Sequence, residues 1–407
     1  MVSHRPLRVA LISGSVIRHD AISASVLADA RAFSADPRFM VQLFSYCCDA
    51  GDVPHRQVGS LTELLLDPCY LASDALIFHF GIYYELFNAL LLGNGHGRRI
   101  VRYHNVTPPE LLPPASARII GKSLDQQHAM AEADAIWPVS PFNHRCLLEL
   151  GLPPERIEVL PLAVDWRPAA AAAGPQRQPL ILYVGRFVTS KGLLDLVEAL
   201  ALLQQRQVPP FRAVLAGSRS FSDAGCIDAL KARLRAHDLD ARVEIRESVA
   251  DAELRELYGS ALLAAFPSYH EGFGVPVIEA LAGGAIPVVA DAAALPETLD
   301  GLGRVVPVRS PPALAAAMAE LLTAHAAGQG RLDPVPVDRG TLAFADYRRQ
   351  VAAHLAAFEP GRVAAELRQR VLDLVAGAHA HGRAGSCRVQ HRGGHAAVIA
   401  RPAQAEE

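Results

Sequence analysis

The sequence predicts an α/β protein with two domains, each a doubly wound parallel sheet, that face each other across a cleft. Apolar runs of strand length alternate with helical patterns through residues 1–165, and the same alternation resumes at residue 179. A segment rich in Pro, Gly and Ala, at 166–178, separates the two sets. This alternation is typical of parallel strands covered by helices, and 407 residues are enough for two domains with full cores.

The predicted elements follow the chain in order. The strands of the first domain are expected at 9–13, 40–46, 75–80, 99–104, 135–140 and 157–162. Those of the second domain are expected at 180–185, 212–217, 242–247, 261–266, 285–290 and 304–308. We therefore expect an N-terminal domain over 1–165, a linker over 166–178, a second domain over 179–340, C-terminal helices over 341–376 and a disordered tail over 377–407, where apolar periodicity fails.

Composition excludes several classes of protein. A net charge of -3 argues against a nucleic-acid binder, and no apolar run approaches the length that spans a bilayer. The apolar start reads better as a first strand than as a signal peptide. The six cysteines show no metal-ligand spacing, so we expect reduced thiols in a cytoplasmic enzyme.

The most informative segment is 261–291, where an apolar run leads through a glycine-bearing turn into a helix and then a second apolar run. Pro276 is expected in the first turn of that helix, and Gly283 near its end. The unpaired N–H groups at a helix N-terminus attract anions. Glu271 and Glu279 bracket this helix start with seven residues between them. Carboxylates beside a phosphate site favour neutral hydroxyls, so the pattern indicates a pocket for a nucleotide sugar.

The stretch EGFGVPVIEA (271–280) resembles the E-x7-E signature of retaining glycosyltransferases with the GT-B fold, glycosyltransferase family 4 (group 1). The resemblance implies two Rossmann-like domains, of which the N-terminal one faces the acceptor and the C-terminal one binds the nucleotide sugar. It implies that Glu271 contacts the hydroxyls of the donor sugar and Glu279 those of the ribose. The loop at Phe273, Gly274 and Val275 would hold the pyrophosphate with its amides.

A second motif, GRFVTSKG (185–192), follows the first expected strand of the second domain. Gly185 lets the chain turn, and the spacing of Arg186 and Lys191 can direct both cations at one anion. Lys191 is one of only three lysines among 39 Lys and Arg residues. The resemblance implies that Arg186 and Lys191 clamp the donor diphosphate, and electrostatic preorganisation can then stabilise the leaving group. Gly14, after the first strand, matches the family's N-terminal glycine-rich loop more weakly.

Two loops of the first domain complete the predicted site. His104 precedes two prolines, which keep it on an irregular loop at a strand end. The resemblance implies that His104 contacts the donor sugar near its reacting carbon, and the alternative is a histidine packed in a turn. Tyr83, at another strand end, is expected either to stack on an acceptor sugar or to fill the core. Asp20 is expected to cap a helix more readily than to serve an acceptor.

The resemblance implies a retaining, metal-independent hexosyltransferase that uses a nucleotide-diphosphate sugar, needs no cofactor and acts in bacterial cell-surface polysaccharide or glycolipid synthesis. The acceptor would be a saccharide or a lipid-linked saccharide. Two alternatives stay open: a GT-B sugar-nucleotide epimerase, and a catalytically silent sugar-binding subunit. Arg98, Arg99 and Arg102 leave two interpretations open: peripheral contact with an anionic membrane at its cytoplasmic face, or, as is more usual for arginines before a strand, plain solvation.

Overall fold

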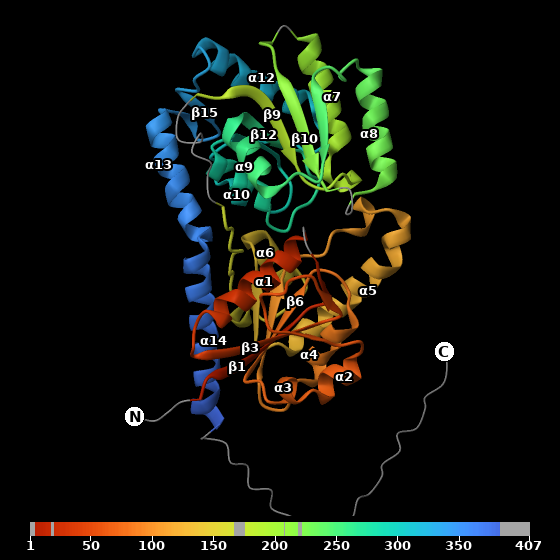
Figure 1. Cartoon of the computed structure of the whole chain (residues 1–407), viewed down its shortest axis with the longest axis vertical. Helices are drawn as coiled ribbons and strands as arrows, with labels where there is room; N and C mark the ends of the chain where they lie inside the picture. Colours follow the sequence, from red (N-terminus) through yellow and green to blue (C-terminus); the bar gives the residue numbers. More distant parts are fainter. Residues whose placement is uncertain (1–4, 18–19, 167–175, 207, 219–221, 383–407) are drawn as a thin grey trace, which may run out of the picture.

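The computed structural model describes residues 5–17, 20–166, 176–206, 208–218 and 222–382. It contains two lobes, each built around a six-stranded sheet (Figure 1). All strand pairs within the two sheets are parallel, so the predicted pair of doubly wound α/β domains is confirmed.

The N-terminal sheet has the order β5-β3-β1-β6-β7-β8. Its central strands are buried on both faces, as parallel strands covered by helices must be. In β1, for example, Val9 and Leu11 join one apolar cluster while Ala10 and Ile12 join another. The strands are β1 (Leu7–Ile12), β3 (Phe39–Ser45), β5 (His55–Gln57), β6 (Ala75–Phe80), β7 (Arg98–Tyr103) and β8 (Ala135–Pro138). The helices are α1 (Ala21–Ser34), α2 (Leu61–Leu66), α3 (Pro68–Leu71), α4 (Ala89–Leu92), α5 (Ala117–Gln127) and α6 (Pro141–Glu149).

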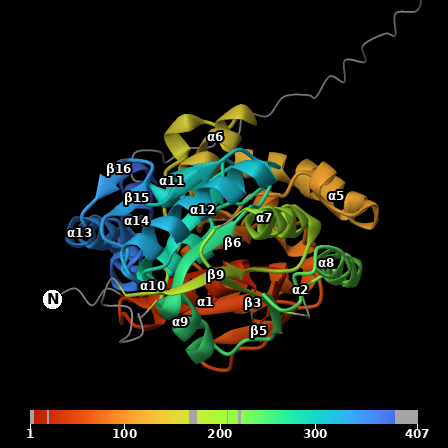
Figure 2. The same ribbon diagram turned by 90° about the horizontal axis from the view of Figure 1, so that it is seen from above.

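The C-terminal sheet has the order β11-β10-β9-β12-β13-β14. Helices α7 and α12 lie side by side over it (Figure 2). The strands are β9 (Gln178–Val184), β10 (Arg212–Gly217), β11 (Val243–Glu247), β12 (Ala261–Phe266), β13 (Ile286–Ala290) and β14 (Arg304–Val306). The helices are α7 (Leu193–Gln205), α8 (Ala224–Ala236), α9 (Asp251–Ser260), α10 (Val275–Gly283), α11 (Leu295–Leu299), α12 (Pro311–Ala327) and α13 (Phe344–Leu355). Two short pairs, β2 (Ser15–Val16) with β4 (Cys47–Cys48) and β15 (Val335–Val337) with β16 (Gly340–Leu342), lie outside the sheets.

The last helix returns to the first domain. After α13, which packs on α10, helix α14 (Pro360–Gly382) runs along the N-terminal lobe (Figure 1). Its apolar residues join the cluster that α1 and β1 form, namely Val363, Leu367, Val371 and Val375. The helix extends through residues 377–382, so the predicted tail boundary at 377 is too early. Residues 383–407 lie outside the described residues.

One predicted strand is wrong. Residues 157–162 form no strand beside β8. They contact it through an isolated bridge from Ile157 to Ile136 and through Leu160 N, which donates to Pro138 O at 3.0 Å. Pro161 has no N–H to donate to a ladder. The carbonyls of this segment accept instead from two arginines: Arg102 Nη1 donates to Leu160 O at 2.7 Å, and Arg370 also binds here.

Candidate functional site

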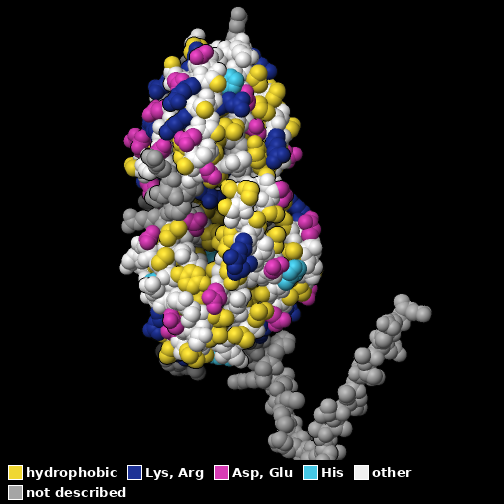
Figure 3. Space-filling model, turned by 90° about the vertical axis from the view of Figure 1, so that its right-hand side faces the viewer, with side chains coloured by type: hydrophobic (Ala, Val, Ile, Leu, Met, Phe, Trp, Pro, Cys, Tyr) yellow, Lys and Arg dark blue, Asp and Glu magenta, His cyan; other side chains and the backbone are white. Residues whose placement is uncertain are grey.

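The candidate site lies between the lobes, where loops after β9 and β12 face loops after β6 and β7. In parallel sheets ligands bind beyond the carboxyl ends of the strands, and here those ends of both sheets point toward each other. A space-filling view shows the surface hollowed between the two lobes (Figure 3). The His104 loop of the first domain and the Glu271 loop of the second domain meet at this boundary.

The helix after β12 begins and ends where the sequence predicts. Helix α10 starts at Val275 with Pro276 in its first turn. Gly274 precedes it at φ 93°, and Gly284 follows it at φ 86°, both in the left-handed region that favours glycine. The N-terminal turn of α10 thus lies at the carboxyl edge of the sheet, and its dipole favours an anion there. Within this turn Pro276 has no N–H, and Val277 N donates to Gly274 O at 2.9 Å.

Lys191 and Glu271 form an ion pair across this edge, from Nζ to Oε1, with side chains 15% and 19% exposed. Ser268 Oγ donates to the same carboxylate oxygen at 3.1 Å. Close packing of the two loops brings the pair together, since a Cβ on Gly192 would lie 2.1 Å from Pro267 O. A larger residue at Gly192, where φ is 67°, would push the loops apart.

The other predicted cation sits differently. Arg186 is exposed, while its carbonyl accepts from Tyr183 Oη at 2.9 Å. Gly185 is required beneath it, because a Cβ there would lie 2.8 Å from the Tyr183 hydroxyl. Lys191 is therefore held in place by a partner, and Arg186 reaches freely from the same loop toward solvent.

Glu279 lies one helical turn further from the loop, on α10. It accepts a hydrogen bond from Tyr258 Oη at 3.2 Å. Burial raises the pKa of Glu279 to about 7, although the Tyr258 hydrogen bond opposes the shift. Glu271 and Glu279 therefore differ in surroundings: the first is paired with a cation and the second with a neutral hydroxyl.

Phe273 packs into the domain interface instead of pointing into the site. It joins a small apolar cluster with Val139 and Leu162 of the first domain and Ile278 of α10. Next to it, a Cβ on Gly272 would lie 2.4 Å from His104 O. The backbones of the two domains are therefore in direct contact here, with no room for a side chain between them. This contact places the Glu271 loop against the His104 loop.

His104 lies on the irregular segment that the prolines predict, directly after β7. Its Nε2 lies 3.1 Å from Nδ1 of His79, on β6. Burial, followed by the nearby charge of Arg102, lowers the pKa of His104 to about 3, so the ring is neutral. A neutral imidazole has one N–H donor and one acceptor nitrogen.

Several interdomain contacts involve residues that the sequence did not single out. His270 Nε2 lies 3.2 Å from Asn105 Oδ1, and Asn105 Nδ2 donates to Asn143 Oδ1 at 2.7 Å. Asn105 is at φ 77°, a backbone that asparagine tolerates better than most residues. Glu297 accepts from the Phe142 amide at 2.7 Å and forms an ion pair with Arg145. No short motif predicts pairs this far apart in the chain.

The two weaker predictions in the N-terminal segment concern Gly14 and Asp20. Gly14 lies between β1 and β2, where a Cβ would come 3.2 Å from Tyr84 Cβ. Asp20 is the N-cap of α1 and accepts from Ser23 N at 2.8 Å, as predicted. His19, the polar neighbour of Asp20 in the same sequence segment, lies outside the described residues.

The three arginines considered for a membrane surface are not a free basic patch. Arg102 is fully buried, with Nε 3.3 Å from Asp29 Oδ2. Arg98 binds Asp134 at 2.9 Å, and Arg99 donates to Leu90 O at 3.1 Å. The expectation that Arg102 faces an anionic membrane is therefore wrong, because its charge is neutralised inside the domain.

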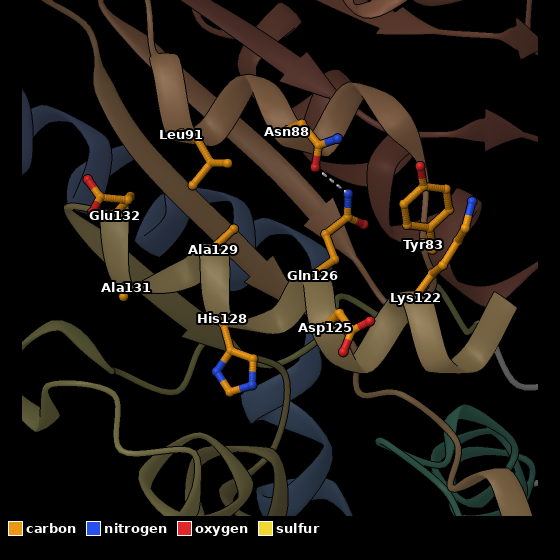
Figure 4. Close-up of a pocket in the computed structure, with 10 residues that line it drawn as sticks. All are labelled: Tyr83, Asn88, Leu91, Lys122, Asp125, Gln126, His128, Ala129, Ala131 and Glu132. Atoms are coloured by element: carbon orange, nitrogen blue, oxygen red, sulfur yellow. Dashed lines mark hydrogen bonds between the residues drawn. The ribbon is translucent and has the colours of Figure 1, made fainter. Parts of the chain in front are cut away.

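A pocket of about 520 Å³ opens on the first domain between α4 and α5 (Figure 4). At one end the Lys122 ammonium lies 4.7 Å from the centroid of the Tyr83 ring. Gln126 Nε2 donates to Asn88 Oδ1 at 2.8 Å along its floor. Tyr83 is only partly buried, so it lines this pocket and does not fill the core. The pocket is lined by Tyr83, Asn88, Leu91, Lys122, Asp125, Gln126, His128, Ala129, Ala131 and Glu132.

The described part of the chain gives three further facts about the site's chemistry. Within it, no group of three or more His, Cys, Asp and Glu side chains is arranged to hold a metal ion. No helix in the same ranges is long and apolar enough to cross a membrane. The five cysteines that the structure describes are free thiols.

Sequence comparison matches residues 169–328 to the family described as "Glycosyl transferases group 1". The chain is 32% identical over 234 residues to a D-inositol 3-phosphate glycosyltransferase of Kineococcus radiotolerans, covering 52% of this chain and 53% of that protein. It is 28% identical over 222 residues to the O-antigen chain mannosyltransferase B of Escherichia coli, covering 51% and 57%. The chain thus spans about half the length of these relatives.

Structural comparison extends over nearly the whole chain. The sucrose-phosphate synthase of Thermosynechococcus elongatus aligns with a TM-score of 0.66 and 19% identity, over 91% of this chain and 100% of that one. Anabaena HepE in complex with UDP aligns with a TM-score of 0.67 and 15% identity, over 90% and 100%. At these identities the likeness shows the fold, which is a GT-B fold formed by the two lobes together.

Proposed function

We propose that this chain, whose residues 169–328 match the group 1 glycosyl transferases, transfers a hexosyl group from a nucleotide-diphosphate sugar to a hydroxyl acceptor. One observation carries the proposal. The Lys191–Glu271 pair, the start of α10 and the His104 loop meet at the boundary between two parallel sheets. A cation and a helix N-terminus suit a diphosphate, and carboxylates suit sugar hydroxyls.

We assign the donor subsites by the chemistry of each group. The diphosphate would bind the α10 amides with Lys191 and Arg186, displacing the Lys191 ammonium from Glu271 toward the more negative ligand. Glu271 would then be free to accept hydroxyls of the sugar. Glu279, deeper on α10, would accept the ribose hydroxyls. Support comes from α10 itself, since Glu271 precedes its N-terminus and Glu279 lies one turn into the helix.

We propose a retaining reaction that needs neither metal nor cofactor. The acceptor hydroxyl would attack from the face that the diphosphate leaves, and a diphosphate oxygen would take its proton. No side-chain nucleophile is then required, and the protein contributes positioning and charge stabilisation. The cations Arg186 and Lys191 would neutralise the charge that develops on the leaving group.

The acceptor would approach from the first domain. Gly81 packs against the His104 loop, with 3.3 Å from its would-be Cβ to His104 Cβ, and Tyr83 follows two residues later. We propose that the acceptor binds in the open pocket that Tyr83 lines, where an aromatic face and polar groups suit a saccharide. Two relatives are named as mannosyltransferases, one of the O-antigen chain and one that uses GDP-mannose and cellobiosyl-diphosphopolyprenol. We propose on that basis a cytoplasmic role in cell-surface saccharide synthesis, at the membrane where the acceptor is lipid-linked.

The experiment is a screen of the purified chain against UDP- and GDP-sugars, with nucleotide release measured with and without saccharide acceptors. A transferase releases nucleotide from one donor, faster when the right acceptor is present. An epimerase changes the sugar without acceptor-dependent consumption, and a silent subunit binds nucleotide without releasing it. Either of these outcomes would replace the proposed function.

A further inference from the structure

A line of buried polar groups runs from α1 to the site and ends at His104. Asp29, His79 and Arg102 are 4%, 1% and 0% exposed. Asp29 Oδ2 lies 3.3 Å from Arg102 Nε and 3.5 Å from His79 Nε2. His79 Nδ1 in turn lies 3.1 Å from His104 Nε2. Three elements (α1, β6 and β7) thus converge behind one residue of the cleft.

These contacts affect stability because the polar groups that make them are buried away from water. Among the described residues, Asp29 Oδ2, His79 Nε2 and Arg102 Nε have no hydrogen bond of their own, so their mutual contacts offset the cost of burying them. The sheet register fixes the arrangement, because His79 and Arg102 are paired neighbours on β6 and β7. The planes of the His79 and His104 rings differ by 18°, which keeps an N–H of one ring close to the plane of the other's lone pair.

Counting hydrogen-bond donors and acceptors indicates which ring nitrogen of His79 carries its proton. Burial raises the pKa of Asp29, and the charge of the neighbouring Arg102 guanidinium opposes that shift. We take Asp29 beside this guanidinium as a carboxylate, which can only accept. Burial lowers the pKa of His79 well below its usual range, so this ring is neutral and carries one proton. That proton belongs on Nε2, facing Asp29, which leaves the Nδ1 lone pair facing His104.

We propose that Asp29 and His79 are positioning residues that fix the tautomer of His104. His104 then carries its proton on Nε2, donates it to His79 Nδ1, and presents Nδ1 as a hydrogen-bond acceptor. A hydroxyl of the bound ligand would donate to that nitrogen. The last step rests on the proposed function, since it takes the ligand to be a sugar donor, whereas the tautomer itself is a property of the protein alone.

The opposite direction is the competing arrangement. A protonated Asp29 would donate to His79 Nε2, and the proton of His104 would then sit on Nδ1, making His104 a donor to the ligand. The Arg102 contact disfavours it, because a guanidinium N–H facing a carboxylic acid gains far less than one facing a carboxylate. The two arrangements place the His104 proton on different ring nitrogens, Nε2 or Nδ1. ¹⁵N NMR distinguishes a protonated ring nitrogen from an unprotonated one.

The test uses the full-length chain labelled with ¹⁵N at histidine, without any ligand. The His104 ring signals are identified by their loss in His104→Asn. We expect a protonated Nε2 whose proton exchanges slowly with solvent, and an unprotonated Nδ1. Protonated Nδ1 in the unmodified chain would overturn the proposal, and this arm needs no variant of the positioning residues to fold.

Two substitutions at His79 separate positioning from packing. His79→Gln can turn its amide N–H toward Asp29 and its oxygen toward His104, whereas His79→Leu can do neither. We expect the slowly exchanging Nε2 proton to persist in the Gln variant and to lose its protection in the Leu variant. Equal protection in both would contradict the proposal.

Kinetics with the donor found in the nucleotide-release screen provide the functional arm. Turnover should fall at least about tenfold more in His79→Leu than in His79→Gln, as expected when a group that orients a functional histidine is removed. The affinity for nucleoside diphosphate should stay equal in both. Equal turnover in the two variants would overturn the positioning role even if the NMR result held, whereas absence of turnover in the unmodified chain would refute only the proposed function.

Discussion

Lys191 and Glu271 form a partly buried ion pair that joins the loop after β9 to the loop after β12. Both residues belong to the predicted donor site, and each neutralises the other's charge in this structure. A diphosphate competes with the carboxylate for the lysine and brings more negative charge. Binding of the donor is therefore expected to replace the Glu271 carboxylate by the diphosphate as the partner of Lys191.

Replacing this lysine tests the diphosphate site. Lys191→Ala should weaken the binding of nucleoside diphosphate by about 1.5–3 kcal/mol, the range for charge-assisted hydrogen bonds. Calorimetry with UDP and GDP measures it. Lys122→Ala is the matched control, because it removes a lysine from the pocket of the first domain and should leave nucleotide affinity unchanged. Equal affinities for the unmodified chain and Lys191→Ala would remove the lysine from the site.

The two glutamates should differ in kind. Glu279→Gln should weaken binding of free nucleoside diphosphate, because a ribose hydroxyl would meet a poorer acceptor. Glu271→Gln should leave that binding nearly intact and depress sugar transfer. Calorimetry and nucleotide release, measured on the same preparations, give both numbers. If the two variants lose nucleotide affinity to the same extent, the division of roles is wrong.

The raised pKa of Glu279 also predicts that the stability of the folded protein depends on pH. Burial raises its pKa from 4.5 to about 7, so the folded state favours the protonated acid. Its contribution is fully present below pH 4.5 and is lost as the pH rises through about 7. Glu279→Gln, which stays neutral, should therefore gain stability relative to the unmodified chain between pH 5 and pH 8. Urea unfolding at both pH values checks this, and a stability difference that does not change with pH would contradict the raised pKa.

Replacing Tyr83 should weaken the binding of the acceptor and leave the use of the donor unchanged. Its ring lines the open pocket and lies beneath the Lys122 ammonium. Tyr83→Ala should raise the KM for a saccharide acceptor about tenfold, within the range of a lost aromatic contact. Hydrolysis of the donor without acceptor should stay unchanged, and Tyr83→Phe should behave nearly as the unmodified chain. An unchanged acceptor KM in Tyr83→Ala would move the acceptor away from this pocket.

Local sequence patterns predicted the elements and missed the contacts between them. The ends of α10 followed from Pro276, Gly274 and Gly284, because each has a conformational reason to be there. The run at 157–162 was apolar enough for a strand, yet Arg102 and Arg370 take its carbonyls from far along the chain. No pattern within a few residues carries that information.

The same limit applies to the site. Its motif residues were found because glycine, proline and charge recur at fixed spacing within one loop and helix. His79 was visible only as a polar residue at a strand end, and Asp29 gave no signal on a helix face. Their relation to His104 arises from the parallel register of β6 and β7 and from the packing of α1. Such networks are tertiary, so they require the fold.

The central claim is that sugar transfer takes place where the His104 loop meets the Glu271 loop, and His104→Ala tests it most directly. Turnover, nucleotide affinity and melting temperature are measured on one preparation, with His96→Ala, an exposed histidine of the same domain, as control. We expect turnover to fall about 100-fold or more, a loss of the size seen for groups acting in the transition state. Nucleotide affinity should stay within a few-fold of the unmodified chain. A stable His104→Ala protein with normal turnover would contradict the account.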